Sequence, residues 1–156
     1  MQKASSTAVR RRLAAILVAD IAGYSRLMSA DEEATLLEMQ KFRFSLVDPT
    51  IGQHHGRIIK TMGDGLLVEF GSVHDAIECS LSIQRGMADR MRGIPENSRF
   101  RYRMGINLCD VFHDGVHVYG DVVNIAARIE TLAEPGGVSI SQDVYKHAHN
   151  KLKFGY

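Results

Sequence analysis

The sequence predicts one α+β domain in which helices cover a sheet of mostly antiparallel strands. Two strand-like apolar runs are joined by Gly63-Asp64-Gly65, and glycine tolerates the positive φ that a tight hairpin turn needs. Residues 100–111 alternate basic and apolar side chains, which is the period of a half-buried strand. Together with helical spacings elsewhere, these runs predict the element order β-α-β-β-α-β-β-α-β-α.

The elements of the first half follow from apolar runs and helix signals. Residues 13–19 form an apolar run, which predicts a strand that stops at Asp20. Acidic residues follow Ser29, which is typical of an N-cap, and Pro49 is expected to end the helix that begins there. The hairpin over residues 57–70 comes next.

The second half alternates helices with short strands. Apolar residues recur at helical spacing after Ser72, and Gly93-Ile94-Pro95 marks a loop beyond this helix. We expect a helix over residues 72–92, a strand over 100–111, a turn at 113–115, a return strand over 116–119, a helix over 122–132, a strand over 138–141 and a helix over 142–149.

The composition is that of an ordinary globular protein, with 156 residues, 45% of them hydrophobic and 24% charged. A net charge of +1 gives no support for nucleic acid or an anionic membrane as a partner. No apolar stretch approaches the roughly 20 residues of a membrane span. Cys79 and Cys109 fit no metal-ligand spacing, so we expect reduced thiols and a cytoplasmic location. We expect residues 1–11 to be a disordered lead-in and residues 12–156 to be the domain.

Asp20 and Asp64 each stand where a strand-like run stops. A carboxylate on a hairpin tip and another at a strand end could share a pair of hard divalent cations, which prefer oxygen ligands. Mg²⁺ in particular works with one or two carboxylates and substrate phosphates, as in phosphoryl or nucleotidyl transfer. On these two residues alone, a plain surface turn is an equally good interpretation.

Other residues could serve such chemistry. Backbone amides in Ala22-Gly23-Tyr24-Ser25, between a strand and a helix, could cradle a triphosphate. Asn124 and Arg128 are four residues apart and share one helix face, where an arginine can neutralise charge that builds on a phosphate. Taken separately, these residues and Lys60 also suit an ordinary solvated surface.

Three strings together resemble the class III nucleotidyl cyclases, which are the catalytic domains of adenylate and guanylate cyclases. They are Val18-Ala19-Asp20-Ile21-Ala22-Gly23-Tyr24-Ser25, Lys60-Thr61-Met62-Gly63-Asp64-Gly65 and Tyr119-Gly120-Asp121-Val122-Val123-Asn124-Ile125-Ala126-Ala127-Arg128. The resemblance covers residues 12–154 in order and spacing. It implies a ferredoxin-like, palm-type sheet that is rich in antiparallel strands and covered by helices.

The resemblance also implies roles for the candidate residues. Asp20 and Asp64 match the two metal-binding aspartates, and the backbone carbonyl of Ile21 matches a further ligand. Asn124 matches the residue that orients the ribose, and Arg128 matches the one that stabilises the transition state. The expected cofactors are two Mg²⁺ or Mn²⁺ ions per site.

Substrate recognition is expected to involve three more positions. Arg103 matches a basic residue near the phosphates, and Lys60 matches the purine-contacting lysine typical of adenylate cyclases. His117 stands where those enzymes usually carry Asp or Thr to accept a hydrogen bond from the adenine amine. A neutral imidazole can accept through one nitrogen. ATP is therefore the expected substrate, and GTP or a pyrimidine nucleotide stays open.

The resemblance implies a phosphorus–oxygen lyase that makes 3′,5′-cyclic AMP and pyrophosphate as a head-to-tail homodimer. Asp20 and Asp64 of one chain would face Lys60, Asn124 and Arg128 of the other. A domain that binds nucleotide or dimerises without turnover is the alternative. Similar domains continue into a further strand with another phosphate-contacting lysine, which is not identifiable here. We therefore expect either a fragment of a longer regulated protein or reduced activity.

Overall fold

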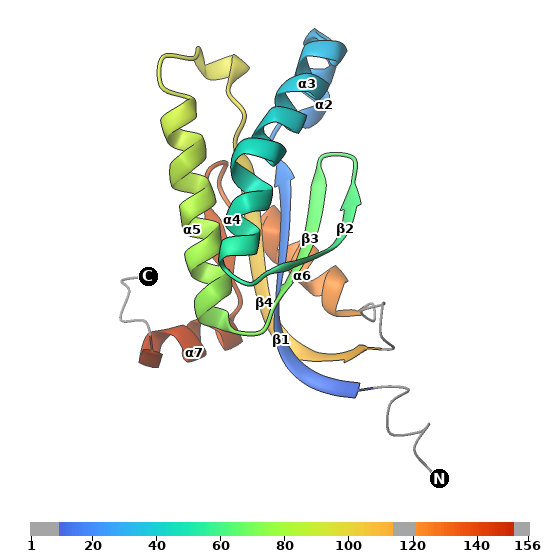
Figure 1. Cartoon of the computed structure of the whole chain (residues 1–156), viewed down its shortest axis with the longest axis vertical. Helices are drawn as coiled ribbons and strands as arrows, with labels where there is room; N and C mark the ends of the chain where they lie inside the picture. Colours follow the sequence, from blue (N-terminus) through green and yellow to red (C-terminus); the bar gives the residue numbers. More distant parts are fainter. Residues whose placement is uncertain (1–9, 114–120, 152–156) are drawn as a thin grey trace.

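The computed structural model describes residues 10–113 and 121–151. Within them, one sheet has the strand order β2-β3-β1-β4-β5, with helices on both faces (Figure 1). The strands are β1 (Arg10–Ile21), β2 (Arg57–Met62), β3 (Gly65–Phe70), β4 (Tyr102–His113) and β5 (Val138–Ile140). The helices are α2 (Tyr24–Ala30), α3 (Glu32–Phe42), α4 (Asp48–Gln53), α5 (Val73–Arg90), α6 (Asp121–Thr131) and α7 (Gln142–Lys151), with a π-helical segment at Arg43–Val47 and a 3-10 turn at Glu96–Ser98.

The central strand is β1, which pairs antiparallel with both β3 and β4. Its register with β4 places Asp20 opposite Arg103 and Ile21 opposite Tyr102. β2 and β3 form an antiparallel hairpin, whereas β5 runs parallel to β4. The sheet is therefore mixed but mostly antiparallel, which confirms the predicted α+β class.

One face of the sheet carries the main core. Ala15, Leu17 and Ala19 alternate along β1 and are buried with side chains of α5 such as Ile77 and Ile83. Removing this apolar surface from water is the main stabilising contribution, because each fully buried side chain of this kind contributes about 1.5–3 kcal/mol. In Figure 1, α4 and α5 lie together on this side of the sheet.

The opposite face is covered in part by α6. Ala14 and Ile16 of β1 pack there with Leu67 of β3 and Ala126 of α6. The helix also lies directly on β4, since a Cβ atom added to Gly105 would be 2.3 Å from the backbone nitrogen of Glu130 and 2.6 Å from its Cα. Only a residue without a Cβ permits such a close backbone approach.

The first helical region differs from the prediction. Ser29 lies inside α2 and caps nothing; the N-cap of α3 is Asp31, whose carboxylate accepts a hydrogen bond from the amide of Ala34 at 3.0 Å. Pro49 lies in the first turn of α4 and does not end a helix. The backbone stays right-handed helical at both junctions of the π-helical segment, so α3, this segment and α4 form one continuous helical run that passes Pro49. Only the extended Asp31 interrupts the predicted helix.

The other predicted elements within the described residues are confirmed, with boundaries that differ by a few residues. Ser72 is the N-cap of α5, and the last two predicted helices correspond to α6 and α7. β1 begins at Arg10, before residue 12, where the sequence places the start of the domain. His113 ends β4, and the predicted return strand over residues 116–119 lies outside the described residues.

In the described ranges, no helix has both the length and the apolar character that a membrane crossing requires.

The contact between α6 and β4 predicts a specific cost for Gly105→Ala. The added methyl group would collide with helix backbone, so we expect the free energy of unfolding to fall by about 1–3 kcal/mol, as in other overpacked interiors. The matched control is Gly52→Ala in α4, where a Cβ meets nothing within 4 Å. Urea denaturation measures both variants. Equal stability of Gly105→Ala and the wild type would contradict the close approach.

Candidate functional site

The two predicted aspartates lie at the same end of the sheet. Asp20 is next to last in β1, and Asp64 lies in the turn between β2 and β3, where Gly63 takes a φ of +57°. Figure 1 shows the hairpin tip and the C-terminal end of β1 side by side. A direct contact joins them, since the amide of Ile21 donates a hydrogen bond to Oδ2 of Asp64 at 2.9 Å. The tertiary structure therefore brings together residues that are 43 positions apart in the chain.

The charges around Asp20 are unbalanced. Burial raises the pKa of Asp20 above its usual value, and the negative charge of Asp64 raises it further. A hydrogen bond with Glu130 and the positive charge of Arg103 act in the opposite direction. The pKa of Asp20 rises on balance, so the ionised form of Asp20 is disfavoured in the free protein, chiefly by burial.

Glu130 is a site residue that the sequence analysis missed. Glu130 belongs to α6 and is only 3% exposed. Burial, with a hydrogen bond to Asp20 and the charge of that residue, raises the pKa of Glu130 to about 8. Ala126 and Glu130 are four residues apart on α6 and both are buried, and Ala133 just beyond the end of the helix is buried as well. A carboxylate within such a stripe of small residues is the sequence signal that could have identified it.

The donor set suits a hard divalent cation only in part. Asp20 and Asp64 offer carboxylate oxygens, which Mg²⁺ and Mn²⁺ prefer. Among the described residues, no group of three or more His, Cys, Asp or Glu side chains is arranged to hold a metal ion. The two carboxylates fit ions that complete their coordination with waters and substrate phosphates, which is how Mg²⁺ is usually bound in nucleotide enzymes.

A basic hollow adjoins the aspartates. It has a volume of about 340 Å³, and Ala22 and Gly23 line it just beyond the end of β1. Four arginines also line it: Arg26, Arg99, Arg101 and Arg103. Glu96 pairs with Arg99 and Arg101, so part of this positive charge is already neutralised.

The predicted phosphate-cradling loop needs one correction. The amide of Ala22 donates to the carbonyl of Arg101 at 2.8 Å, so it is not free to bind a phosphate. Gly23 is the N-cap of α2 and has no side chain to cap the helix. The amides of Tyr24 and Ser25 lie in the first turn of α2, where no partner within the helix is available. The candidate donors are thus reduced to Gly23, Tyr24 and Ser25.

Asn124 and Arg128 lie on the outer face of α6 and are exposed. Lys60 is exposed on the edge strand β2. No hydrogen bond or ion pair joins any of these three side chains to Asp20 or Asp64 in the described structure. One copy of the chain therefore brings Arg103 next to the predicted metal ligands but pairs none of Lys60, Asn124 and Arg128 with them within the described residues.

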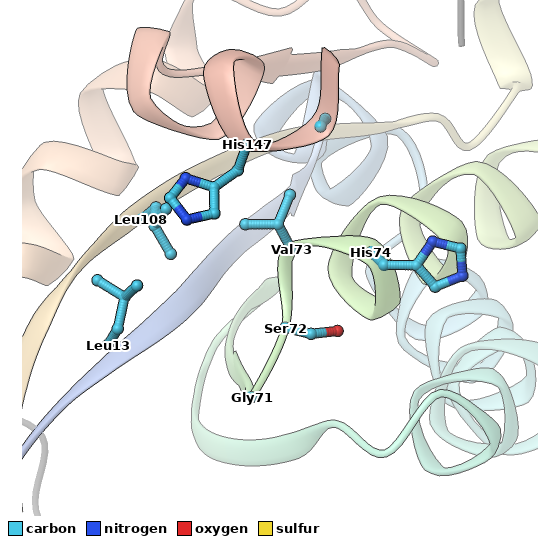
Figure 2. Close-up of a pocket in the computed structure, with 8 residues that line it drawn as sticks. Leu13, Gly71, Ser72, Val73, His74, Leu108 and His147 are labelled. Carbon is cyan, nitrogen blue, oxygen red and sulfur yellow. The ribbon is translucent and has the colours of Figure 1, made fainter. Parts of the chain in front are cut away.

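One predicted site residue is not placed by the structure, and one cavity lies apart from the predicted site. His117 lies outside the described residues. A cavity of about 220 Å³ is lined by Leu13, Val73 and Leu108 among others (Figure 2). Leu13 lies near the start of β1, whereas Asp20 lies near its end. His147 of α7 points toward this cavity and His74 points away from it (Figure 2). None of its lining residues is a predicted site residue.

Comparison with known proteins gives consistent matches. The family model of the adenylate and guanylate cyclase catalytic domain matches residues 8–155. Putative adenylate cyclase 3 of Rhizobium meliloti (strain 1021) is 47% identical over 149 residues, which are 95% of this chain and 25% of that protein. An adenylate cyclase of Glutamicibacter nicotianae is 31% identical over 146 residues, which are 90% of this chain and 33% of that protein. The chain thus spans a quarter to a third of the length of these two relatives.

Solved structures match as well. The Adenylate/Guanylate Cyclase/Hydrolase from Silicibacter pomeroyi has a TM-score of 0.84 at 41% identity and covers 94% of this chain and 85% of its own. The adenylyl cyclase CyaB from P. aeruginosa has a TM-score of 0.79 at 22% identity, with 92% of this chain and 83% of its own covered, and shows the likeness of fold alone.

The raised pKa of Glu130 predicts a pH-dependent stability. In the metal-free protein, folded Glu130 keeps its proton up to a pH of about 8, whereas the unfolded side chain loses it near 4.5. The folded state then binds more protons, so the free energy of unfolding should fall as pH rises from 4.5 toward 8. Each unit of pKa shift corresponds to about 1.4 kcal/mol.

Urea denaturation in the presence of a chelator, at several pH values, measures this dependence. Glu130→Gln cannot titrate, so its stability should vary less over the same range. An identical pH dependence in the variant and the wild type would show that the Glu130 pKa is not raised.

Proposed function

Because the chain belongs to the family of adenylate and guanylate cyclase catalytic domains, we propose that it converts ATP to 3′,5′-cyclic AMP and pyrophosphate. The observation that supports this most is the meeting of Asp20 and Asp64 beside an arginine-lined hollow. In this reaction the ribose 3′-oxygen bonds to the α-phosphorus while the bond to the pyrophosphate oxygen breaks. The proton of the 3′-hydroxyl leaves to solvent.

Asp20, Asp64 and the backbone carbonyl of Ile21 would hold two Mg²⁺ or Mn²⁺ ions. When bound, such ions lower the pKa of the 3′-hydroxyl and neutralise charge on the leaving pyrophosphate. The chain prepares the site by orienting the two carboxylates. The hydrogen bond from the amide of Ile21 holds Asp64 against the end of β1.

The triphosphate would lie in the basic hollow at the end of β1. Arg103 lines this hollow and lies opposite Asp20 in the sheet, so it can contact a phosphate next to the metal ligands. The amides of Gly23, Tyr24 and Ser25 would add donors at the start of α2. A phosphate gains most from fixed donors, because they need no rearrangement when charge develops.

We place Asn124 and Arg128 in the site of a second copy of the chain. Asn124 would orient the ribose, and Arg128 would stabilise charge on the reacting phosphate. The exposed apolar side chains near these residues support a head-to-tail homodimer. Ile125 and Leu132 of α6 are 44% and 78% exposed, and Met62 near the hairpin tip is 49% exposed. Such residues suit an interface that excludes water.

ATP is favoured as the substrate over other nucleotides. Lys60 suits contact with a purine, and both relatives described above are named adenylate cyclases. A cyclase for GTP or a pyrimidine nucleotide is the second candidate, since His117 stands at the position expected to accept from the adenine amine. A domain without turnover is disfavoured, because dimerisation alone does not require two metal carboxylates.

We also propose that residues 12–156 act as the catalytic part of a longer cytoplasmic protein. The small share of the relatives' length that the chain spans supports the first part of this proposal. Burial raises the pKa of Cys79 to about 12, so its thiol stays protonated and unreactive. This agrees with a reduced cysteine.

Turnover of separate nucleoside triphosphates tests the function. With Mn²⁺ present, we expect cyclic AMP from ATP, with the product identified by mass, and little product from GTP, CTP or UTP. Asp64→Ala should lower kcat by at least about 100-fold because it removes a metal ligand, while the half-buried turn position leaves the fold intact. Normal turnover of Asp64→Ala would rule out the metal assignment, and a different cyclic product would change the substrate.

Mixing of two inactive variants tests the shared site. Asp64→Ala and Arg128→Ala should each be inactive as homodimers. A heterodimer of the two contains one site with all its residues, so the mixture should recover part of the wild-type kcat. The recovered fraction is measured over a range of mixing ratios. No recovery at any ratio, with heterodimer formation verified, would contradict the head-to-tail arrangement.

A further inference from the structure

Glu130 occupies an unusual place for an acidic side chain. It is 3% exposed, on the face of α6 that lies against the sheet. The close approach of α6 to Gly105 brings the backbone of Glu130 itself onto β4. Gly105 is two residues from Arg103 in the same strand, so both lie on the same face, and the register places Asp20 of β1 opposite Arg103. Glu130 therefore lies against the Asp20–Arg103 pair.

The polar atoms of this group are not fully satisfied within the chain. Oε2 of Glu130 and Nε of Arg103 are both buried without a hydrogen-bond partner among the described residues. Burial of an unsatisfied polar atom destabilises the fold, so a purely structural role would be better served by an apolar side chain. Orphaned buried polar atoms in native proteins call for a functional explanation.

We propose that Glu130 is a positioning residue that holds the carboxylate of Asp20 in the orientation needed for metal binding. This inference rests on the proposed function and extends it to a residue that touches neither substrate nor metal. Groups that orient a metal-binding carboxylate from behind contribute strongly to metal affinity. The packing of α6 on Gly105 keeps Glu130 in place.

The two faces of α6 would then serve different sites. Glu130 on the buried face contacts Asp20 of its own chain. Arg128 on the exposed face would reach the site of the partner copy. A defect at Glu130 should therefore affect the site that contains its own Asp20, and not the site to which its own Arg128 contributes. This difference separates a positioning role from a general disturbance of α6.

Direct binding of Mn²⁺ tests the inference without turnover. Free Mn²⁺ is measured by electron paramagnetic resonance in the presence of a non-reactive ATP analogue. Glu130→Leu keeps the volume and removes every polar atom, so we expect Mn²⁺ affinity to fall at least about tenfold. Glu130→Gln can still donate a hydrogen bond to Asp20, and its Mn²⁺ affinity should stay within about threefold of the wild type. Glu33→Leu, the same change at an exposed position of α3, should bind like the wild type.

Wild-type Mn²⁺ affinity in Glu130→Leu would overturn the inference. A loss in Glu130→Gln as large as that in Glu130→Leu would overturn it as well, because the negative charge itself would then be required. Circular dichroism and thermal unfolding verify that each variant is folded. If Glu130→Leu is not folded, Glu130→Ala, which inserts no new bulk, takes its place with the same expected loss.

The mixed dimers give the second test. The intact site of the Asp64→Ala and Arg128→Ala heterodimer takes its metal ligands from the Arg128→Ala chain. Adding Glu130→Leu to that chain should remove the recovered activity. Adding Glu130→Leu to the Asp64→Ala chain should leave the activity within about twofold of that of the heterodimer without it. Equal losses in the two arrangements would overturn the positioning role, since a distorted α6 would also misplace Arg128.

Failure of the inference and failure of the proposed function are distinguishable. If the wild type binds Mn²⁺ through Asp20 but turns over no nucleotide, the proposed function fails. The Mn²⁺ affinities of the wild type and Glu130→Leu still test the role of Glu130 in that case. If the wild type is an active cyclase and Glu130→Leu matches it in Mn²⁺ affinity, the inference alone fails. Absence of both turnover and Mn²⁺ binding would refute both.

Discussion

The close contact between α6 and β4 at Gly105 is the constraint on which the site depends. Because Gly105 has no Cβ, the backbone of the helix lies directly on the strand at Glu130. The depth and rotation of α6 then follow: Ala126 and Glu130 face the sheet, while Asn124 and Arg128 face solvent. A bulkier residue in the strand would lift the helix and displace both of its functional faces together.

The end of the sheet gathers charge that the chain does not neutralise. Asp20, Asp64 and Glu130 are three acids around the single guanidinium of Arg103 in this group, and burial raises the pKa of two of them. Such a concentration costs stability in the free protein. In the proposed function this concentration becomes useful, because cations and a triphosphate would bring charges of both signs to the same place. The adjoining hollow is lined by arginines, whose positive charge is opposite to that of the phosphates.

Much of this fold could be predicted from local patterns. The Gly63-Asp64-Gly65 hairpin, the cap of α5 at Ser72 and the amphipathic helices depend on neighbours within a few residues, so periodicity and turn chemistry predict them. The helical region before residue 54 was harder to predict from the sequence. Ser29 and Asp31 are both good N-cap residues two positions apart, and only packing selects Asp31. Pro49 misled because the helix continues past it, where a π-helical segment passes into α4.

The sequence by itself determined the family and supplied candidate residues for its site, because Asp20, Asp64, Asn124 and Arg128 lie in contiguous motifs whose spacing can be read along the chain. The roles of these residues stay predictions. The tertiary structure alone decided three other things: the hydrogen bond between Ile21 and Asp64, the loss of the Ala22 amide to Arg101, and the burial of Glu130 beside Asp20. Each of these joins residues more than 40 positions apart or depends on how closely a helix meets a strand. Pairing and packing distances of this kind have no local signature, so they emerge only when the sheet and its helices assemble.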